Sequence, residues 1–242
     1  MDQKKLDVTK MVEKCAYTQC YCEENVYKVL ERLYLFSVIS TRQHLPFAVK
    51  RMYAVFVSSY NVTEAEEKKN IWSSLVSIRC GLDDVVSWDY HVFALLQLDC
   101  EEEDAAAWFV IDFDTKLFPF MSLIPLREYM RESFERFDRR DHRLAFKSKV
   151  LMKLIPVDVY LRVFCSDRSH MVAGGKFTSP PPAHPAILEP SPLISGSKED
   201  VSSRQDKPTS NLVSFINMSN RSIQGATVIK ASEIVQWTRS LN

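Results

Sequence analysis

The chain reads Trp88-Asp-Tyr-His-Val-Phe-Ala-Leu-Leu-Gln-Leu98 and, after an acidic run, Ala107-Trp-Phe-Val-Ile-Asp-Phe-Asp114. Both stretches are rich in apolar, aromatic and β-branched residues, which is typical of buried strands. The acidic run 99–104 suits a hairpin turn, so the two strands are predicted to pair antiparallel. With the turn near residues 101–104, positions 91 and 112 fall roughly opposite each other. We therefore expect His91 and Asp112 to share one face of a sheet.

A helix is predicted on the N-terminal side of these strands. Apolar residues recur at three- and four-residue steps from Glu23 to Phe36, which is the pattern of one helix face. Glu23 and Glu24 lie in its first turn, where they favour the positive end of the helix dipole. Cys22 is therefore expected at, or just before, a helix N-terminus.

The remaining elements complete an α+β domain. We predict strands at 53–57 and 150–155, and helices at 126–137, 157–165 and 233–241, the last with Ser232 as a candidate cap. Residues 1–14 are polar and are predicted to form a loose leader, followed by one catalytic domain over 15–242. Seven of the eleven prolines lie between Gly174 and Pro208, and the stretch 189–210 is predicted to be a disordered insertion.

Composition excludes several classes of protein. Thirty-one basic residues balance thirty-one acidic ones, so no overall field recruits nucleic acid or an anionic membrane. The apolar runs are too short to span a membrane, and the N-terminus lacks a signal-peptide core. The expected location is the cytoplasm, with the nucleus as a second compartment. The cysteines are then free thiols, and because the pair Cys20 and Cys22 has no second Cys/His pair, no metal site is predicted.

Cys22, His91 and Asp112 together could perform nucleophilic catalysis. A thiolate is the nucleophile, and a helix start with a nearby imidazolium can lower a cysteine pKa. Histidine transfers protons near neutral pH, and a carboxylate on its second nitrogen fixes the tautomer. Spacing alone leaves alternatives open: His91 could be a buried core histidine, and Asp112 a turn former at a strand end.

Four short words resemble those of protein N-terminal glutamine amidohydrolases, and they occur in the same order. They are Cys20-Tyr-Cys-Glu-Glu-Asn25, Trp88-Asp-Tyr-His-Val92, Asp112-Phe-Asp-Thr115 and Ser166-Asp-Arg-Ser-His-Met171. The resemblance covers the chain from about Cys15 to the C-terminal helix. It implies a single-domain α-β-α sandwich, related to papain and transglutaminases, with a mainly antiparallel sheet. It also implies a Cys-His-Asp triad, which motif by motif is Cys22, His91 and Asp112.

The implied reaction converts an N-terminal glutamine into glutamate and releases ammonia through a thioester, without a cofactor. The implied partners are proteins or peptides with a free N-terminal glutamine, acted on by a monomer that feeds the N-degron pathway of degradation. The free α-ammonium group of such a substrate calls for a carboxylate. Glu24 and Asp89 lie inside the motif words and are the candidate substrate-binding residues.

Several neighbours have two interpretations. Glu23 and Glu24 could serve only to stabilise the helix start, and this interpretation is favoured for Glu23. Arg168 could bridge carboxylates with its planar guanidinium, or could lie in a polar turn. Trp88 and Tyr90 alternate with His91 along the predicted strand, so they are expected on the opposite face.

Two other functions remain open. The same triad would serve a transglutaminase or a cysteine protease, although no acidic loop resembling an EF-hand is present. A non-catalytic module that binds N-termini is the other alternative.

Overall fold

The computed structural model describes residues 3–43, 49–60, 76–79, 85–99, 108–135, 150–194 and 210–241 of the 242-residue chain. Its α-helices are α1 (Gln3–Val12), α2 (Cys22–Arg42), α3 (Leu126–Met130), α5 (Val157–Val163), α6 (Leu212–Ile216) and α7 (Ile234–Arg239). Its strands are β1 (Val49–Ser58), β2 (Val76–Arg79), β3 (Val85–Trp88), β4 (His91–Leu98), β5 (Trp108–Ile111), β6 (Ile124–Pro125), β7 (Leu151–Pro156), β8 (Val172–Ala173), β9 (Lys176–Phe177) and β10 (Thr227–Lys230). Short helical turns are the π-helical η2 (Arg131–Glu135) and the 3-10 turns η4 (Ser169–Met171) and η6 (Ala231–Glu233).

The central sheet has the strand order β10-β7-β1-β4-β5-β6, and its neighbouring strands pair antiparallel. Strands β4 and β5 are the two strands predicted around the acidic run, and Ala94 pairs with Ile111 in their register. The predicted antiparallel pair is therefore confirmed. The acidic turn itself, at 100–107, lies outside the described residues.

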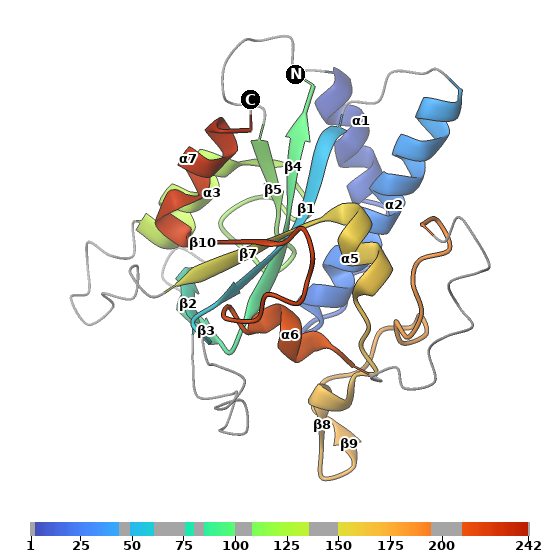
Figure 1. The fold of residues 1–242 in the computed structure, drawn as a ribbon, viewed down its shortest axis with the longest axis vertical. Helices are drawn as coiled ribbons and strands as arrows, with labels where there is room; N and C mark the ends of the chain where they lie inside the picture. The colour runs from blue at the N-terminus through green and yellow to red at the C-terminus, as the bar shows by residue number, and fades with distance from the viewer. Residues whose placement is uncertain are drawn as a thin grey trace.

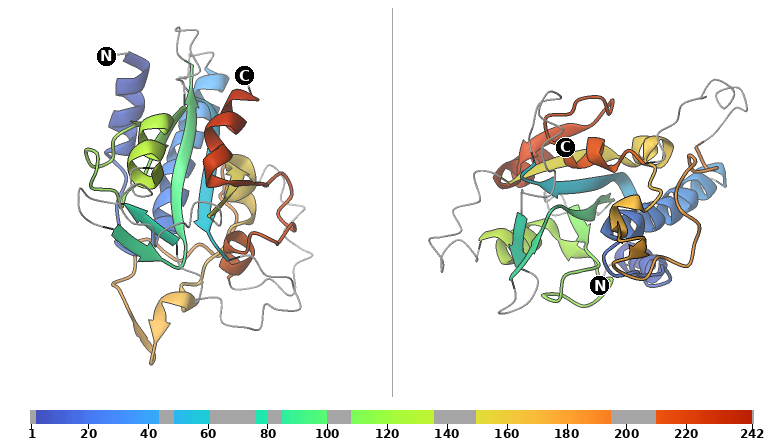
Figure 2. Two further views of the ribbon diagram at one scale, coloured as in Figure 1. Left: turned by 90° about the vertical axis from the view of Figure 1, so that its left-hand side faces the viewer. Right: turned by 90° about the horizontal axis from the view of Figure 1, so that it is seen from below.

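Helices cover both faces of this sheet because its strands are apolar on both sides. In β1, Ala54 and Phe56 belong to one buried cluster, and Val55 and Val57 belong to another. Alternate residues of a strand point to opposite faces, so an unbroken apolar run needs a cover on each. Figures 1 and 2 show α1, α2 and α5 on one side, with α3 and α7 on the other. The fold is a mixed helix-and-sheet domain with a mostly antiparallel sheet, as predicted.

The N-terminal segment differs from the prediction of a loose leader. Residues Gln3–Val12 form α1, in which Val8 and Val12 are buried in the core on the α2 side. Their four-residue spacing puts both side chains on one helix face, and that face packs against the domain. The prediction failed because the segment is polar overall and its buried face contains only a narrow apolar stripe.

The predicted insertion at 189–210 is ordered where it begins. Ser191 is buried, and its hydroxyl donates a hydrogen bond of 2.7 Å to Oε1 of Glu31 on α2. Its backbone N–H also donates to Leu161 O. The prediction of disorder is therefore wrong for residues 189–194, while 195–209 lie outside the described residues.

Element boundaries shifted at three further places. Helix α2 continues to Arg42, beyond the predicted end at Phe36. The predicted helix 126–137 is α3 followed by the π-helical turn η2 (Arg131–Glu135), and residues 136–137 lie outside the described residues. Ser232 lies inside the 3-10 turn η6 and does not cap α7. Among the helices described, none has the length and apolarity that a membrane span requires.

Candidate active site

Cys22 is the first residue of α2, and the turn before it is held rigidly. The side chain of Asn25 accepts a hydrogen bond from Thr18 N–H (3.0 Å) and donates one to Thr18 O (2.8 Å). Cys20 adopts a left-handed φ of 68°, an uncommon conformation for a residue with a β-carbon. This turn leaves the Cys20 thiol exposed and sends Cys22 inward, where it packs against the core on the α2 side.

His91 and Asp112 form a buried pair at the adjoining end of the sheet. His91 begins β4 and Asp112 directly follows β5, and the distance from His91 Nε2 to Asp112 Oδ1 is 3.1 Å. Asp112 is held in turn by Tyr129 of α3, whose hydroxyl donates to Oδ2 at 2.7 Å. The predicted pairing of His91 with Asp112 is present. Tyr129 carried no sequence signal, because it lies in a different element and no motif includes it.

The charges of this pair stabilise each other. Burial would lower the pKa of His91, but the charge and hydrogen bond of Asp112, together with the charge of Asp114, hold that pKa above its ordinary value. Burial would raise the pKa of Asp112, but His91 and the hydrogen bonds from Tyr129 and Asp114 N–H lower it. The ring is therefore placed to hold a proton on behalf of a neighbouring nucleophile.

The other ring nitrogen of His91, Nδ1, lies near a second carboxylate. His91 Nδ1 lies 4.0 Å from Asp114 Oδ2, and Asp114 Oδ1 accepts a hydrogen bond of 2.6 Å from Tyr17. Ligand atoms of His91, Asp112 and Asp114 lie within 4.8 Å of one another, so these three residues could hold a divalent ion. Binding of such an ion would disrupt the contact between His91 Nε2 and Asp112 Oδ1.

The Cys22 thiol lies beside this pair in surroundings that oppose its ionisation. Burial raises its pKa well above the ordinary value, the charges of Glu23, Asp114 and Asp112 raise it further, and a hydrogen bond from Val92 N–H lowers it. The thiol points toward Glu23, with Sγ 3.6 Å from Oε2. This result differs from the expectation that the helix start and a nearby imidazolium would lower the cysteine pKa. A proton acceptor is required, and His91, next to Val92, is the adjacent base.

Two aromatic residues contact the site, contrary to the predicted strand alternation. The chain leaves the strand conformation at Asp89 and Tyr90, between β3 and β4. Trp88 consequently stacks on the His91 ring, with ring centroids 4.7 Å apart. The Tyr90 hydroxyl donates to Glu23 Oε2 at 3.0 Å. The expectation that both residues point away from the site is wrong, because it assumed one unbroken strand.

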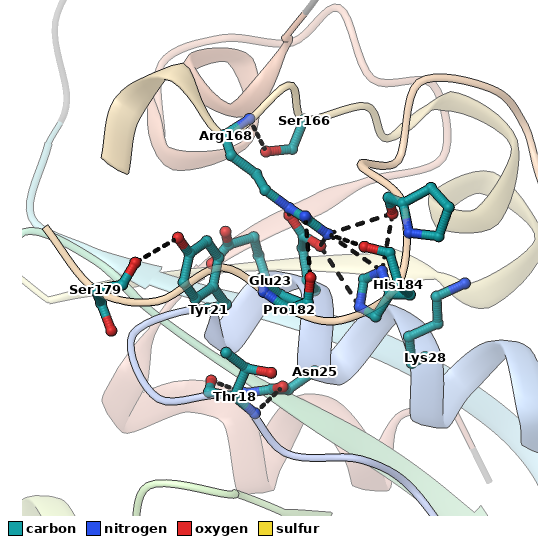
Figure 3. A network of polar contacts seen from close by, with 12 residues as sticks. Thr18, Tyr21, Glu23, Asn25, Lys28, Ser166, Arg168, Ser179, Pro182 and His184 are labelled. Atoms are coloured by element: carbon teal, nitrogen blue, oxygen red, sulfur yellow. Dashed lines mark hydrogen bonds and ion pairs between the residues drawn. The ribbon is translucent and has the colours of Figure 1, made fainter. Parts of the chain in front are cut away.

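The two glutamates after Cys22 have different partners, although each side chain is 0% exposed. The Glu24 carboxylate accepts hydrogen bonds from both Nε (2.9 Å) and Nη2 (2.7 Å) of Arg168, which is the bidentate contact that a planar guanidinium makes with a carboxylate. Of the two interpretations of Arg168, the structure supports the carboxylate clamp. Figure 3 shows Arg168 reaching toward His184 and Pro182, whose segment it also holds.

Glu23 instead faces the thiol, Tyr90 and His170, whose Nε2 lies 3.4 Å from Glu23 Oε1. Asp89 is half-buried nearby and accepts the N–H of Tyr90. The pKa of its carboxyl is raised by burial and influenced by the charges of His170 and Glu23. Of the two residues predicted to bind substrate, Asp89 therefore lies beside Glu23, while Glu24 is paired with Arg168.

Comparison with known proteins identifies similar chains. The family model described as N-terminal glutamine amidase matches residues 17–238. A protein N-terminal glutamine amidohydrolase of Danio rerio is 36% identical over 185 residues, which are 76% of this chain and 77% of the relative. Proteins of the same name from Drosophila melanogaster and Drosophila ananassae are 35% and 34% identical over 73% of this chain and 74% of their own length.

Proposed function

The chain belongs to the N-terminal glutamine amidase family, and from this we propose that it hydrolyses the side-chain amide of N-terminal glutamine in proteins and peptides. The observation that carries the proposal is the arrangement of three groups. Cys22 at the start of α2 adjoins the buried His91–Asp112 pair at the end of the sheet. These are the parts that amide hydrolysis through a thioester requires.

In the proposed reaction, the Cys22 thiol passes its proton to His91 and its sulfur attacks the amide carbon. Backbone N–H groups in the first turn of α2 have no partner within the helix and face the developing oxyanion. His91 then protonates the departing nitrogen, so ammonia leaves and a thioester remains. Water, deprotonated by His91, attacks the thioester, which releases the glutamate side chain and restores the thiol.

Asp112 and Trp88 support this proton transfer without touching the substrate's amide. Asp112 stabilises the protonated ring and fixes which nitrogen faces Cys22. Trp88 stacks on the ring and limits its rotation. Asp112 is itself fixed by Tyr129, so the base is supported from two elements.

A wider relationship is proposed on the same grounds. A cysteine at a helix start, packed against an antiparallel sheet that carries histidine and aspartate, supports the predicted kinship with papain and transglutaminases. A monomer in the cytoplasm and nucleus that feeds the N-degron pathway is proposed from composition and family resemblance. Size-exclusion chromatography would test the monomeric state, and imaging of the tagged protein would test the location.

The test is incubation of the protein with a Gln-first peptide, followed by mass spectrometry and measurement of ammonia. We expect ammonia release, and the small mass gain of an amide converted to a carboxylic acid, without cleavage of the peptide. A peptide with glutamine in second position is the matched control and should remain unchanged. Peptide cleavage would indicate a protease, transfer to an added amine a transglutaminase, and binding without change a non-catalytic module.

A further inference from the structure

The beginning of α2 contains a buried carboxylate with one oxygen unused. Glu23 Oε2 accepts the Tyr90 hydroxyl and faces the Cys22 thiol. Glu23 Oε1 has no hydrogen-bond partner among the described residues, although the side chain is 0% exposed. Buried polar atoms are satisfied in the great majority of cases, and an exception at a buried carboxylate requires a physical reason.

The residue opposite this oxygen is also unsatisfied. His170 is 9% exposed in its side chain, its Nε2 lies 3.4 Å from Glu23 Oε1, and neither ring nitrogen has a hydrogen-bond partner within the described part of the chain. Asp89 lies close enough to both groups that their charges act on its carboxyl. Glu23, His170, Asp89 and Tyr90 form what we call the Glu23 cluster. It contains two carboxylates and unused hydrogen-bonding capacity directly beside the nucleophile.

This chemistry suits a small cation with several N–H donors. A buried carboxylate without a full counter-charge is unfavourable, and a primary ammonium group would supply both the charge and the donors. The charge of Arg168 acts on Glu23, but its N–H groups do not reach that carboxylate, because Nε and Nη2 donate to Glu24 and the guanidinium also donates to carbonyl groups in the segment 182–185. Within the described residues, Glu23 Oε1 and both ring nitrogens of His170 therefore remain available to hydrogen-bond a ligand that brings its own charge and donors.

The distances fit an N-terminal glutamine. Its α-nitrogen is separated from the amide carbon by the α-carbon and two methylenes, so the two groups lie a few ångströms apart. Glu23 Oε2 is 3.6 Å from Cys22 Sγ, the same scale. Because both separations are a few ångströms, a glutamine whose amide carbon reaches Sγ can place its ammonium group within reach of the Glu23 cluster. An internal glutamine would bring a peptide group there, without the charge.

We propose that Glu23 is the receptor for the α-ammonium group of the substrate, with His170 and Asp89 beside that group. The inference rests on the proposed amidohydrolase function and identifies the residue that makes it selective for N-termini. It replaces Glu24 in this role, because Glu24 is fully engaged by Arg168.

Recognition and nucleophile activation are coupled in this arrangement. After burial, the charge of Glu23 is the largest cause that raises the pKa of Cys22. An ammonium group paired with Glu23 neutralises that charge, so the thiol gives its proton to His91 more easily. A substrate with an acetylated amino group leaves the charge in place, and the thiol stays protonated.

The decisive experiment compares two peptides on three proteins. One peptide begins with glutamine, and the other is its des-amino analogue, in which hydrogen replaces the α-ammonium group. The ratio of their kcat/KM values is measured for the wild type, Glu23→Gln and Glu24→Gln. A hydrogen bond between charged groups corresponds to roughly 10- to 100-fold, so Glu23→Gln should reduce the ratio by that factor. Glu24→Gln should lower stability but keep the ratio.

The outcomes separate this inference from the proposed function. A wild type that releases no ammonia from the Gln-first peptide contradicts the function, whatever Glu23 does. An active wild type whose ratio survives in Glu23→Gln contradicts the inference alone, and loss of the ratio in Glu24→Gln instead would assign the receptor to Glu24. If Glu23→Gln does not fold, Glu23→Asp is used instead. This variant keeps the carboxylate charge but moves it one methylene away from the ammonium group, so it should reduce the ratio partially.

A second measurement detects the coupling without substrate. The rate of Cys22 alkylation by iodoacetamide is followed against pH in the wild type and in Glu23→Gln, with thermal unfolding as the check on folding. The alkylation midpoint should shift to lower pH in the folded variant, because one of the charges opposing the thiolate is gone. An unchanged midpoint would contradict the coupling.

Discussion

At the scale of single residues, neighbouring cysteines differ more than their sequence positions suggest. Cys20 and Cys22 are separated by one residue, yet the left-handed φ of Cys20 turns its thiol outward and Cys22 inward. The charges of Asp112 and Asp114 and the N–H of Val92 act on the Cys22 thiol. Position at the helix start and proximity to the His91–Asp112 pair, not thiol exposure, single out Cys22 as the proposed nucleophile.

Replacement of the two cysteines should therefore have unequal effects. Cys22→Ser should abolish ammonia release, because no other described thiol lies beside His91, whereas Cys20→Ser should retain substantial activity. Ammonia release from a Gln-first peptide is the measurement. In the wild type, inactivation by iodoacetamide should follow modification of Cys22, as mapped by peptide mass spectrometry. An active Cys22→Ser protein would refute the assignment of the nucleophile.

Asp112→Asn tests the other half of the site. Because Asp112 contributes the charge and hydrogen bond that raise the pKa of His91, this pKa should fall in the variant, as followed by NMR titration. The loss of a comparable aspartate from a catalytic triad lowers kcat about 10⁴-fold, and we expect a similar loss here. Tyr129→Phe is the matched control: it removes one hydrogen bond from Asp112 but keeps its charge, and should have a smaller effect.

The same variant predicts a pH dependence of stability. A raised histidine pKa stabilises the folded state fully below the unfolded value of about 6.5, and this contribution disappears as pH rises through the folded value. The difference in unfolding free energy between wild type and Asp112→Asn should therefore shrink as pH rises through the folded pKa of His91. Denaturant titrations at several pH values would measure it, and a difference that grows with pH would contradict the sign.

At the scale of elements, the start of α2 is joined to the segment that follows α5. Ser166 bridges to Ile187, and Arg168 holds Glu24 while its guanidinium also donates to carbonyl groups of Pro182 and His184. Residues 166–187 thus close over the helix start and bring His170 to Glu23. Arg168 adopts a left-handed φ of 64°, which is maintained by these contacts.

Arg168→Ala should destabilise the protein by about 3–5 kcal/mol, because it leaves the buried Glu24 without its counter-charge. Arg168→Lys should recover only part of that loss, since an ammonium group cannot make both contacts of the planar guanidinium. Chemical denaturation measures both variants, and limited proteolysis should show new cleavage between residues 169 and 185. Wild-type stability in Arg168→Ala would mean that the ion pair is offset by its own desolvation.

At the scale of the whole molecule, the site lies where the adjoining ends of β4 and β5, one helix start and one long connection converge. The connection begins after α5 and is anchored at Ser191, whose hydroxyl donates to Glu31 and whose N–H donates to Leu161. It returns at Asn211, whose side chain accepts the N–H of Cys165. Ser191 and Asn211 thus hold the connection to the rest of the domain at two places.

Two deletions should separate the anchors from the chain between them. Replacing 196–208 with a short Gly/Ser linker should preserve cooperative unfolding and activity, because the composition of this stretch offers little apolar surface to bury. Removing 189–210 should lower stability, because it takes away the buried Ser191. Thermal unfolding of both variants is the measurement. Loss of cooperative unfolding in the shorter deletion would show that 196–208 contributes to the fold.

The sequence by itself determined the central elements and the identity of the candidate triad. Apolar periodicity located α2, β1, β4, β5 and β7 because burial imposes a local pattern on every helix and strand. The motif words identified Cys22, His91 and Asp112 because they occur in the same order as in protein N-terminal glutamine amidohydrolases. Periodicity failed at α1 and at Ser191, where short polar segments carry only one or two buried side chains.

Only the tertiary structure decided which glutamate faces Cys22. Glu23 and Glu24 are adjacent in α2, and successive helix residues point about 100° apart, so one turns toward Cys22 and the other toward Arg168. Their partners come from residues 90, 168 and 170, far along the chain. No local pattern in a sequence records which distant side chain will fill which side of a helix, because that choice is made when the elements pack.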